Sequence, residues 1–147
     1  MPAGNTYWIQ EGMISKELRN MDIDGDGKVD HFCFSVWNQF LHAKHPLGWI
    51  RNVSVCIDGE EIPTHRIFFV LRDQWIGIEQ MPTISDIWWM LREEAEIYIR
   101  QDDGIVSGKH DVECTMEIST LTNTRIVDKN DLYPRLILKL QSQMARY

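Results

Sequence analysis

Cysteine is scarce in this sequence, and the cysteines do not occur in pairs. Cys33, Cys56 and Cys114 are widely spaced, and each lies in a stretch of alternating polar and apolar residues. A structural zinc site usually needs close pairs such as C-x-x-C, so the sequence predicts none. We expect the three thiols to be small, buried and reduced side chains, as in a cytoplasmic protein.

Long apolar runs and an excess of positive charge are also missing. No run of about 18 apolar residues occurs, and residues 1–7 show no basic segment followed by an apolar one, so we expect neither a membrane span nor a signal peptide. The 22 acidic side chains outnumber the 15 basic ones and give a formal net charge of -7. Such a chain repels polyanions, which argues against a nucleic-acid partner.

No recognisable catalytic motif is present. No serine lies in a G-x-S-x-G elbow, no cysteine has the context of a nucleophile, and no Gly-rich phosphate loop occurs. His42 and His45 form an H-x-x-H pair, but they lack a third ligand at a suitable spacing. We therefore assign no catalytic residue and no transition-metal site to this chain.

Short alternating segments separated by turns make up most of the sequence. Its 147 residues and 44% hydrophobic content allow one domain with a buried core, and we assign residues 1–147 to it. Strands are predicted around 31–37, 53–57, 67–71, 95–99, 112–118 and 136–140. The pattern predicts an all-β fold, an antiparallel β-sandwich of two packed sheets with little helix. Asp58-Gly59 marks a hairpin turn, and one helical turn is expected at most, within residues 84–96.

The densest motif is an acidic loop over residues 22–30, with the pattern D-x-D-x-D-G-x-x-D. Three carboxylates at alternate positions, a following backbone carbonyl and a last carboxylate can surround one hard cation, and calcium suits such oxygen ligands. The predicted metal ligands are Asp22, Asp24, Asp26, Lys28 through its carbonyl, and Asp30.

Two interpretations of this loop remain open. Counting from Asp22, the twelfth position is Cys33 and not the bidentate Glu of the helical calcium loop, so a calcium loop at a β-hairpin tip is favoured over a helical one. The alternative is a hairpin turn made by Gly25 and Gly27, whose aspartates are merely solvated. In both cases the loop is structural and not catalytic.

Two adjacent tryptophans, Trp88 and Trp89, are the other conspicuous feature. Neighbouring residues of a strand face opposite ways, so one ring must point away from the core. An exposed tryptophan suits a sugar platform or a subunit interface. The alternative is that both rings are buried between two sheets. Trp88 and Trp89 are thus candidates for substrate or interface contact.

Several segments together resemble a known family. They are residues 53–63 (VSVCIDGEEIP), 67–70, 86–89 (DIWW), 95–99 and 104–118, with a looser likeness at 18–21 and 32–46. The chain resembles the β subunit of bacterial C-glycoside deglycosidases, chiefly over residues 45–120. The motifs of that family are patterns of strands and turns without an invariant catalytic signature, and an acidic loop of this kind is not expected of it as a rule.

The resemblance implies a β-sandwich that partners a larger α subunit with a xylose-isomerase-like barrel. That subunit is expected to hold a divalent metal, manganese, and the catalytic groups of a carbon–carbon lyase. The implied substrate is a 3-oxo-C-glucoside of a flavonoid-type aglycone, whose C–C glycosidic bond breaks by elimination. A loop over residues 40–49, with His42, Lys44 and His45, is a candidate to line or close the pocket, so that this chain caps the active site.

Two other functions also fit the sequence. A calcium-stabilised β-sandwich carbohydrate-binding module would use Trp75, Trp88 or Trp89 as a sugar platform, although such modules usually carry a leader or a linker. A free-standing scaffold or assembly factor fits the lack of catalytic residues. Co-expression with a barrel-type subunit separates the first interpretation from these two.

Overall fold

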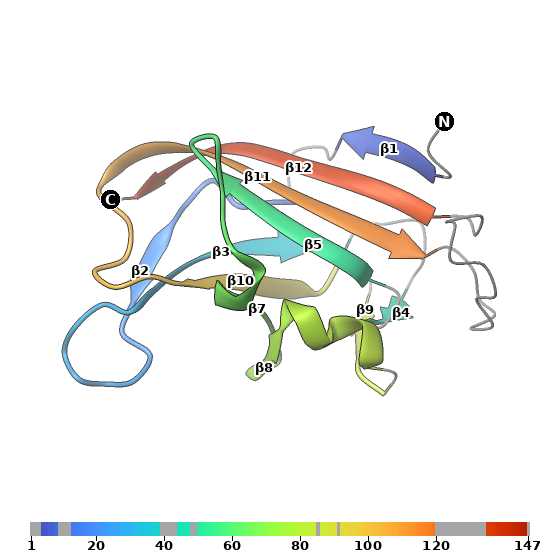
Figure 1. Ribbon diagram of the computed structural model, residues 1–147, viewed down its shortest axis with the longest axis horizontal. Coiled ribbons are helices and arrows are strands. Elements are labelled where there is room, and N and C mark those ends of the chain that lie inside the picture. Colours follow the sequence, from blue (N-terminus) through green and yellow to red (C-terminus); the bar gives the residue numbers. More distant parts are fainter. Residues whose placement is uncertain are drawn as a thin grey trace.

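Two five-stranded sheets pack face to face in the computed structural model, and a two-stranded ribbon lies beside them (Figure 1). The structure describes residues 4–8, 13–38, 44–47, 50–84, 86–90, 92–119 and 135–146. Sheet A has the order β1 (Gly4–Trp8), β12 (Arg135–Arg146), β11 (Gly108–Ser119), β5 (Ile50–Ile57) and β6 (Glu60–Glu61). Sheet B has the order β2 (Arg19–Met21), β3 (His31–Trp37), β10 (Glu94–Arg100), β7 (Ile67–Leu71) and β8 (Gln74–Gly77). The ribbon pairs β4 (Lys44–Pro46) with β9 (Trp88–Met90).

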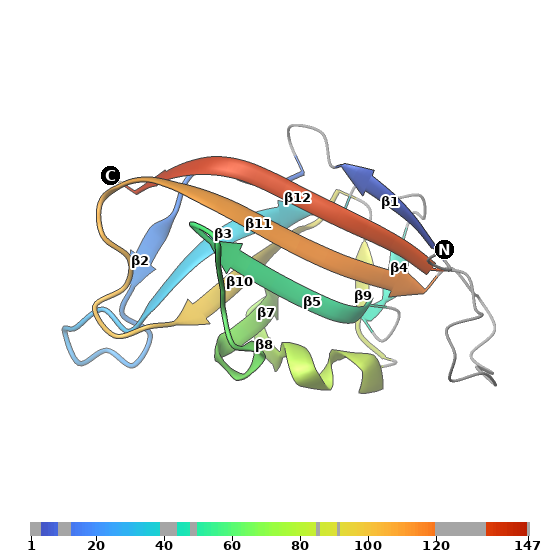
Figure 2. The ribbon, with the colours of Figure 1, turned by 45° about the horizontal axis from the view of Figure 1, so that its top comes forward.

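Neighbouring strands run antiparallel, except that β1 and β12 pair in parallel. Figure 2 shows the two longest strands, β11 and β12, side by side across the molecule. Helix among the described residues is limited to two 3₁₀ segments, η2 (Thr64–Arg66) and η3 (Ile78–Thr83), and no helix there is long and apolar enough to cross a membrane. The predicted all-β sandwich with little helix is confirmed; the parallel pair was not predicted.

The core lies between the sheets because alternate residues of each strand point inward. In sheet B, Phe32 and Phe34 of β3 lie opposite Ile99 and Ile97 of β10, and all four are buried. Sheet A contributes the buried residues Val53, Val55, Val112, Cys114 and Met116 to the same cluster. Complete burial of a side chain of this size contributes about 1.5–3 kcal/mol. The alternation seen in the sequence is therefore the main source of the fold's stability.

The Asp58-Gly59 hairpin forms as predicted between β5 and β6. Both turn residues have positive φ, 51° and 85°, which is the geometry that favours Asp-Gly. Asp58 also ties the turn to β11, because its carboxylate accepts a hydrogen bond from His110 Nδ1 at 2.7 Å and one from the backbone N–H of Asp111 at 2.8 Å. These two hydrogen bonds hold the pKa of Asp58 below its ordinary value.

His110 is buried with an oxygen acceptor at each ring nitrogen. Its Nδ1 faces the Asp58 carboxylate, and its Nε2 lies 2.8 Å from the carbonyl oxygen of Val106. Neither oxygen can donate, so both hydrogen bonds form only when both ring nitrogens carry a proton. The imidazolium form thus joins the β5–β6 turn to the loop before β11.

The helical turn expected within residues 84–96 is wrong. Part of that segment forms β9 and the start of β10, and its other described residues contain no helix. The ring of Trp89 fills a core position 5.2 Å from that of Phe69, which favours extended backbone there. The short helix lies earlier, in η3, where Ile78 and Met81 are both buried at the three-residue spacing of a 3₁₀ helix.

The three cysteines are all free, in agreement with the expectation of reduced thiols. Cys33 and Cys114 are fully buried, as predicted. Cys56 is only half-buried, so the prediction is wrong for this residue. Its neighbours Val55 and Ile57 take the inward positions of β5, which leaves Cys56 on the outer face of sheet A.

The connection between β10 and β11 packs tightly against β2. The side-chain amide of Asn20 donates to the carbonyl oxygen of Ile105 at 3.0 Å, and its oxygen accepts the N–H of Ile105 at 2.9 Å. Gly104 precedes this pair with φ of +68°, and a Cβ at this position would lie 2.4 Å from Asn20 Oδ1 and 2.7 Å from Val29 Cγ1. Only glycine fits both the conformation and the space.

We expect Gly104→Ala to destabilise the fold by about 2–4 kcal/mol, since it adds overpacking to backbone strain. Gly59→Ala is the matched control, because Gly59 also has positive φ, +85°, but nothing lies within 4 Å of its added Cβ. Urea unfolding of both variants measures the difference. An equal decrease in the free energy of unfolding of the two variants would show that the close contact with Asn20 does not add to the cost of Gly104→Ala.

We expect Asp58→Asn to lower the melting temperature at pH 7 by about 2–4 °C. A carboxylate whose pKa is depressed by folding stabilises the native state above its unfolded pKa, and this contribution disappears as the pH falls through the folded pKa. The melting curves of wild type and variant should therefore converge as the pH falls below 3.8. Asp73→Asn is the control, because Asp73 has a similar φ of 64° in the β7–β8 turn. A constant difference at every pH would contradict the role of the Asp58 charge.

Candidate functional site

The acidic loop joins β2 to β3 and forms the tip of that hairpin, at the left of Figure 1. Met21 pairs with His31 at the last rung, and the N–H of Asp30 donates to the carbonyl of Met21 at 3.0 Å. Positive φ values of 78° and 88° at Gly25 and Gly27 allow the tight reversal. The predicted position of the loop at a β-hairpin tip is confirmed.

Three carboxylates converge in this loop. Asp22, Asp24 and Asp30 each contribute one oxygen, and these oxygens lie within 4.8 Å of one another. Backbone N–H groups hold them: the two loop glycines donate to Asp22 at 2.9 and 2.8 Å, while Ile23 and Asp24 donate to Asp30 at 2.9 and 3.1 Å. Donors of this kind favour the charged carboxylates, so the loop brings negative charge together in a defined arrangement.

The carboxylates differ in electrostatic environment. A 2.6 Å hydrogen bond from His31, together with the N–H groups of Ile23 and Asp24, holds the pKa of Asp30 well below its usual range. The N–H of Asp26 lowers the pKa of Asp24, but desolvation and the neighbouring carboxyl groups outweigh it and leave that pKa raised. Desolvation and the neighbouring carboxyl groups of Asp22 and Asp26 therefore disfavour the charged form of Asp24, which a cation bound nearby would favour.

Oxygen ligands of this kind fit a hard divalent cation such as calcium. The fit rests on three water-exposed or half-buried carboxylates at a suitable spacing. Asp26 lies outside this group, and its carboxylate accepts the N–H of Lys28 at 2.8 Å. Asp26 and the Lys28 carbonyl stay predicted ligands, and the three convergent carboxylates do not include them.

Four rings gather on the outer face of sheet B, the face turned away from the core. We name them the aromatic patch: His31 of β3, Phe68 of β7, Trp75 of β8 and Tyr98 of β10. The ring centroid of Trp75 lies 4.4 Å from that of Tyr98, 5.8 Å from Phe68 and 5.6 Å from His31. The sequence singled out Trp75 alone, because the cross-strand register that assembles the patch cannot be read from separate strands.

The tryptophan pair divides as the alternation of a strand requires. Trp88 is 40% exposed, whereas Trp89 is fully buried and donates its indole N–H to the carbonyl of Glu93 at 2.8 Å. Trp88 therefore offers a contact surface. The ring of Trp89 anchors the ribbon to the core and is not accessible to substrate or partner.

The other predicted contact residues lie at or near β4. Lys44 and His45 belong to this strand and pair with Met90 and Trp89 of β9. His42 lies outside the described residues. The structure thus places two of the three residues on the strand that pairs with Trp88, the exposed member of the tryptophan pair.

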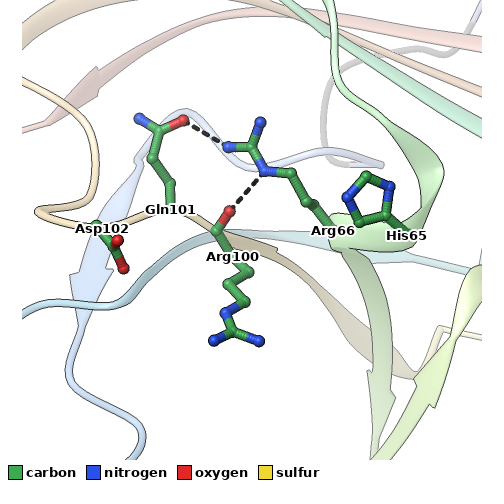
Figure 3. A pocket seen from close by; sticks show the side chains of 5 residues that line it. All are labelled: His65, Arg66, Arg100, Gln101 and Asp102. Carbon is green, nitrogen blue, oxygen red and sulfur yellow. Dashed lines mark hydrogen bonds between the residues drawn. The ribbon is translucent and has the colours of Figure 1, made fainter.

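A polar cavity of about 440 Å³ opens beside η2 (Figure 3). It is lined by His65, Arg66, Arg100, Gln101 and Asp102. Arg66 donates from Nε to the carbonyl of Arg100 and from a terminal nitrogen to Gln101 Oε1, both at 2.9 Å. The guanidinium of Arg66 is thereby committed to holding η2 against the end of β10, and the cavity lining contains no serine, threonine, cysteine or lysine.

The buried thiols are poor nucleophiles. Burial raises the pKa of Cys114 to about 12 and also raises the pKa of Cys33. Both thiols are therefore protonated at neutral pH, whereas a catalytic cysteine needs a thiolate.

A family model matches most of the chain. The model of the C-glycoside deglycosidase beta subunit matches residues 9–121, which include the acidic loop, the aromatic patch and the β4–β9 ribbon. No curated protein matches the chain. The family match spans most of the 147 residues and confirms the resemblance seen in the strands and turns. The chain belongs to the C-glycoside deglycosidase beta subunit family.

Proposed function

We propose that this chain docks on a larger α subunit with a xylose-isomerase-like barrel and helps to enclose an active site whose reactive groups belong to that subunit. Membership of a beta subunit family carries the proposal, because a beta subunit implies an alpha partner. In the described part of the chain, the one group of three potential metal ligands is the acidic loop, and the buried thiols are protonated. The free cysteines suit a reducing compartment, so we place the complex in the cytoplasm.

The substrate that we propose is a 3-oxo-C-glucoside of a flavonoid-type aglycone. A ketone at C3 of the sugar acidifies the neighbouring C–H, and a base of the partner removes that proton. The electrons of the C–H bond form a C=C bond in the sugar, the C–C bond to the aglycone breaks, and the aglycone carbon takes up a proton. A divalent metal such as manganese, bound in the α subunit, supplies stabilisation of the charge on the ketone oxygen.

The β4–β9 ribbon and residues 40–49 are the part of the chain that we propose as the cap. Trp88 is exposed there, and Trp89 fixes the ribbon from below. An apolar ring over a charged intermediate excludes water and strengthens the electrostatic interactions within the site. His42, Lys44 and His45 lie in the same segment and are our candidates for contact with substrate or partner.

The complex is expected to release aglycone from a 3-oxo-C-glucoside when this chain is co-expressed with a barrel-type α subunit, and neither chain should do so efficiently alone. The measurement is aglycone release by chromatography, with mixtures of the separately purified chains as a control. Turnover by this chain alone would refute the proposal. Glycan binding by the isolated chain through Trp75, which is 41% exposed, would support the alternative of a carbohydrate-binding module.

The acidic loop is proposed to bind one calcium ion that stiffens the β2–β3 hairpin. The support comes from the convergence of Asp22, Asp24 and Asp30, whose like charges a cation would neutralise. The solvated-turn alternative predicts the same loop with no preference for the ion.

We expect calorimetry to show calcium binding that Asp24→Asn weakens by about 10-fold or more, because the variant loses a charged ligand. Asp26→Asn should have a smaller effect, since this carboxylate lies outside the convergent group. Asp86→Asn, on an exposed residue outside the loop, is the control. Absence of binding heat, and of any change in melting temperature on chelation, would leave only the solvated turn.

A further inference from the structure

Part of the outer face of sheet B is apolar, although no element of the described chain covers it as a layer; the same face also carries polar side chains, among them Arg19, Ser35 and Glu96. Cys33, Val70 and Tyr98 form a buried cluster on this face, with Met21 and Phe68 packed against it. These residues alternate with those that fill the core, so sheet B has apolar side chains on both faces. In a two-layer sandwich the outer face of a sheet is normally polar.

Sheet A follows the normal pattern. The outward residues of its strands β5 and β11 are polar or half-exposed: Asn52, Ser54, Cys56, Asp111, Glu113, Thr115 and Glu117. Among the described side chains, the outer faces of β5 and β11 therefore lack an apolar cluster like that of sheet B. Cys33, Val70 and Tyr98 are buried, so the apolar area of sheet B meets solvent mainly through the ring of Trp75, which is 41% exposed and can anchor a partner.

The aromatic patch makes this surface rigid. Tyr98 pairs with Phe68 on one side and with Cys33 on the other, and Trp75 pairs with Val70. The rings touch one another edge-on or tilted, at centroid separations of 4.4–6.2 Å. Trp75 remains 41% exposed on top of this assembly. A large ring held in place by other rings loses little entropy on binding, which is the property of an interface hot spot.

The charges around the patch are unequally distributed. At the end where His31 and Arg100 lie, a hollow of about 400 Å³ is lined by five aspartates, Asp24, Asp26, Asp30, Asp102 and Asp103, against Lys28 and Arg100. Asp22 adds a further carboxylate next to them, so this end stays negative even with one divalent cation bound. A partner that covers the patch must therefore present Lys or Arg at this end.

The opposite end of the patch is continuous with the proposed cap. Arg72, in the turn between β7 and β8, donates to the carbonyl of Trp88 at 2.9 Å and forms an ion pair with Glu93. The hairpin that carries Trp75 is therefore fastened to the β4–β9 ribbon. A partner bound along sheet B would therefore adjoin the β4–β9 ribbon.

We propose that the outer face of sheet B, centred on Trp75, is the surface on which the α subunit docks, with a basic stretch of that subunit at the acidic end. This inference rests on the proposed function, because it assumes the α partner. The docked partner buries the aromatic patch, the acidic end steers its approach, and the β4–β9 ribbon is left at the border of the interface, next to the partner's active site.

The first test measures the affinity of the purified chain for the α subunit by calorimetry. Trp75→Ala is expected to weaken the complex by about 10-fold or more, and Trp75→Phe should restore most of the affinity. Asn52→Ala, on the outer face of sheet A, is the control and should leave the affinity unchanged. Melting temperatures of all variants establish that the chain remains folded.

A second measurement needs no variant. Hydrogen exchange of the wild-type chain is measured with and without the α subunit. Binding should protect the backbone amides of residues 67–77 and 22–31 and change those of β5 and β11 in sheet A little. Protection of sheet A with unchanged exchange along β8 would overturn the docking surface, as would self-association of the isolated chain through Trp75.

Two double variants test whether the acidic end contributes to association. Asp102→Asn combined with Asp103→Asn should lower the association rate constant several-fold at low salt, and the difference should shrink at high salt. Glu60→Gln combined with Glu61→Gln removes the same charge from sheet A and should have little effect. A wild-type chain that forms no complex refutes the proposed function together with this surface. A complex that tolerates Trp75→Ala and is indifferent to both charge pairs refutes the surface alone.

Discussion

The pairing of β10 with β3 and β7 is the constraint on which the rest of the molecule depends. Its inward residues, Ile97 and Ile99, meet the phenylalanines of β3 and complete the core of sheet B. Its outward residue Tyr98 joins the rings of β7 and β8. A shift of one residue in this register would exchange the two faces of the strand and place Glu96 in the core. Core and binding surface are therefore fixed by the same hydrogen bonds.

The alternation of apolar residues was sufficient to predict the sandwich, and the Asp58-Gly59 turn was correct because positive φ at two adjacent positions leaves few other choices. The helical turn was wrong because the burial of Trp89 beside Phe69 is a tertiary contact that overrides local preference. The acidic loop was located from its spacing alone. The aromatic patch was missed because four strands contribute to it, and no single segment shows their register.

The proposed function implies a division of labour between this chain and its alpha partner. The chain keeps the thiols of Cys33 and Cys114 buried and protonated and commits Arg66 to a backbone carbonyl, so these groups are used for structure. What it offers to a partner is shape: a rigid aromatic surface, an acidic end and an exposed tryptophan on a fastened ribbon. These properties suit the enclosing role that we propose, because an enzyme gains from holding water away from a charged intermediate without adding competing acids and bases.

The buried thiol of Cys33 can report on local opening of sheet B. Its thiol is buried opposite Arg19 of the short strand β2, which reaches the rest of sheet B through three cross-strand pairs and the ion pair of Arg19 with Glu96. A reagent can reach this buried sulfur only after a local opening of the side chains that cover it or of the β2–β3 edge. The alkylation rate of Cys33 therefore reports on local opening around this edge. Because β2 continues directly into the acidic loop, the same rate senses whatever stiffens the loop.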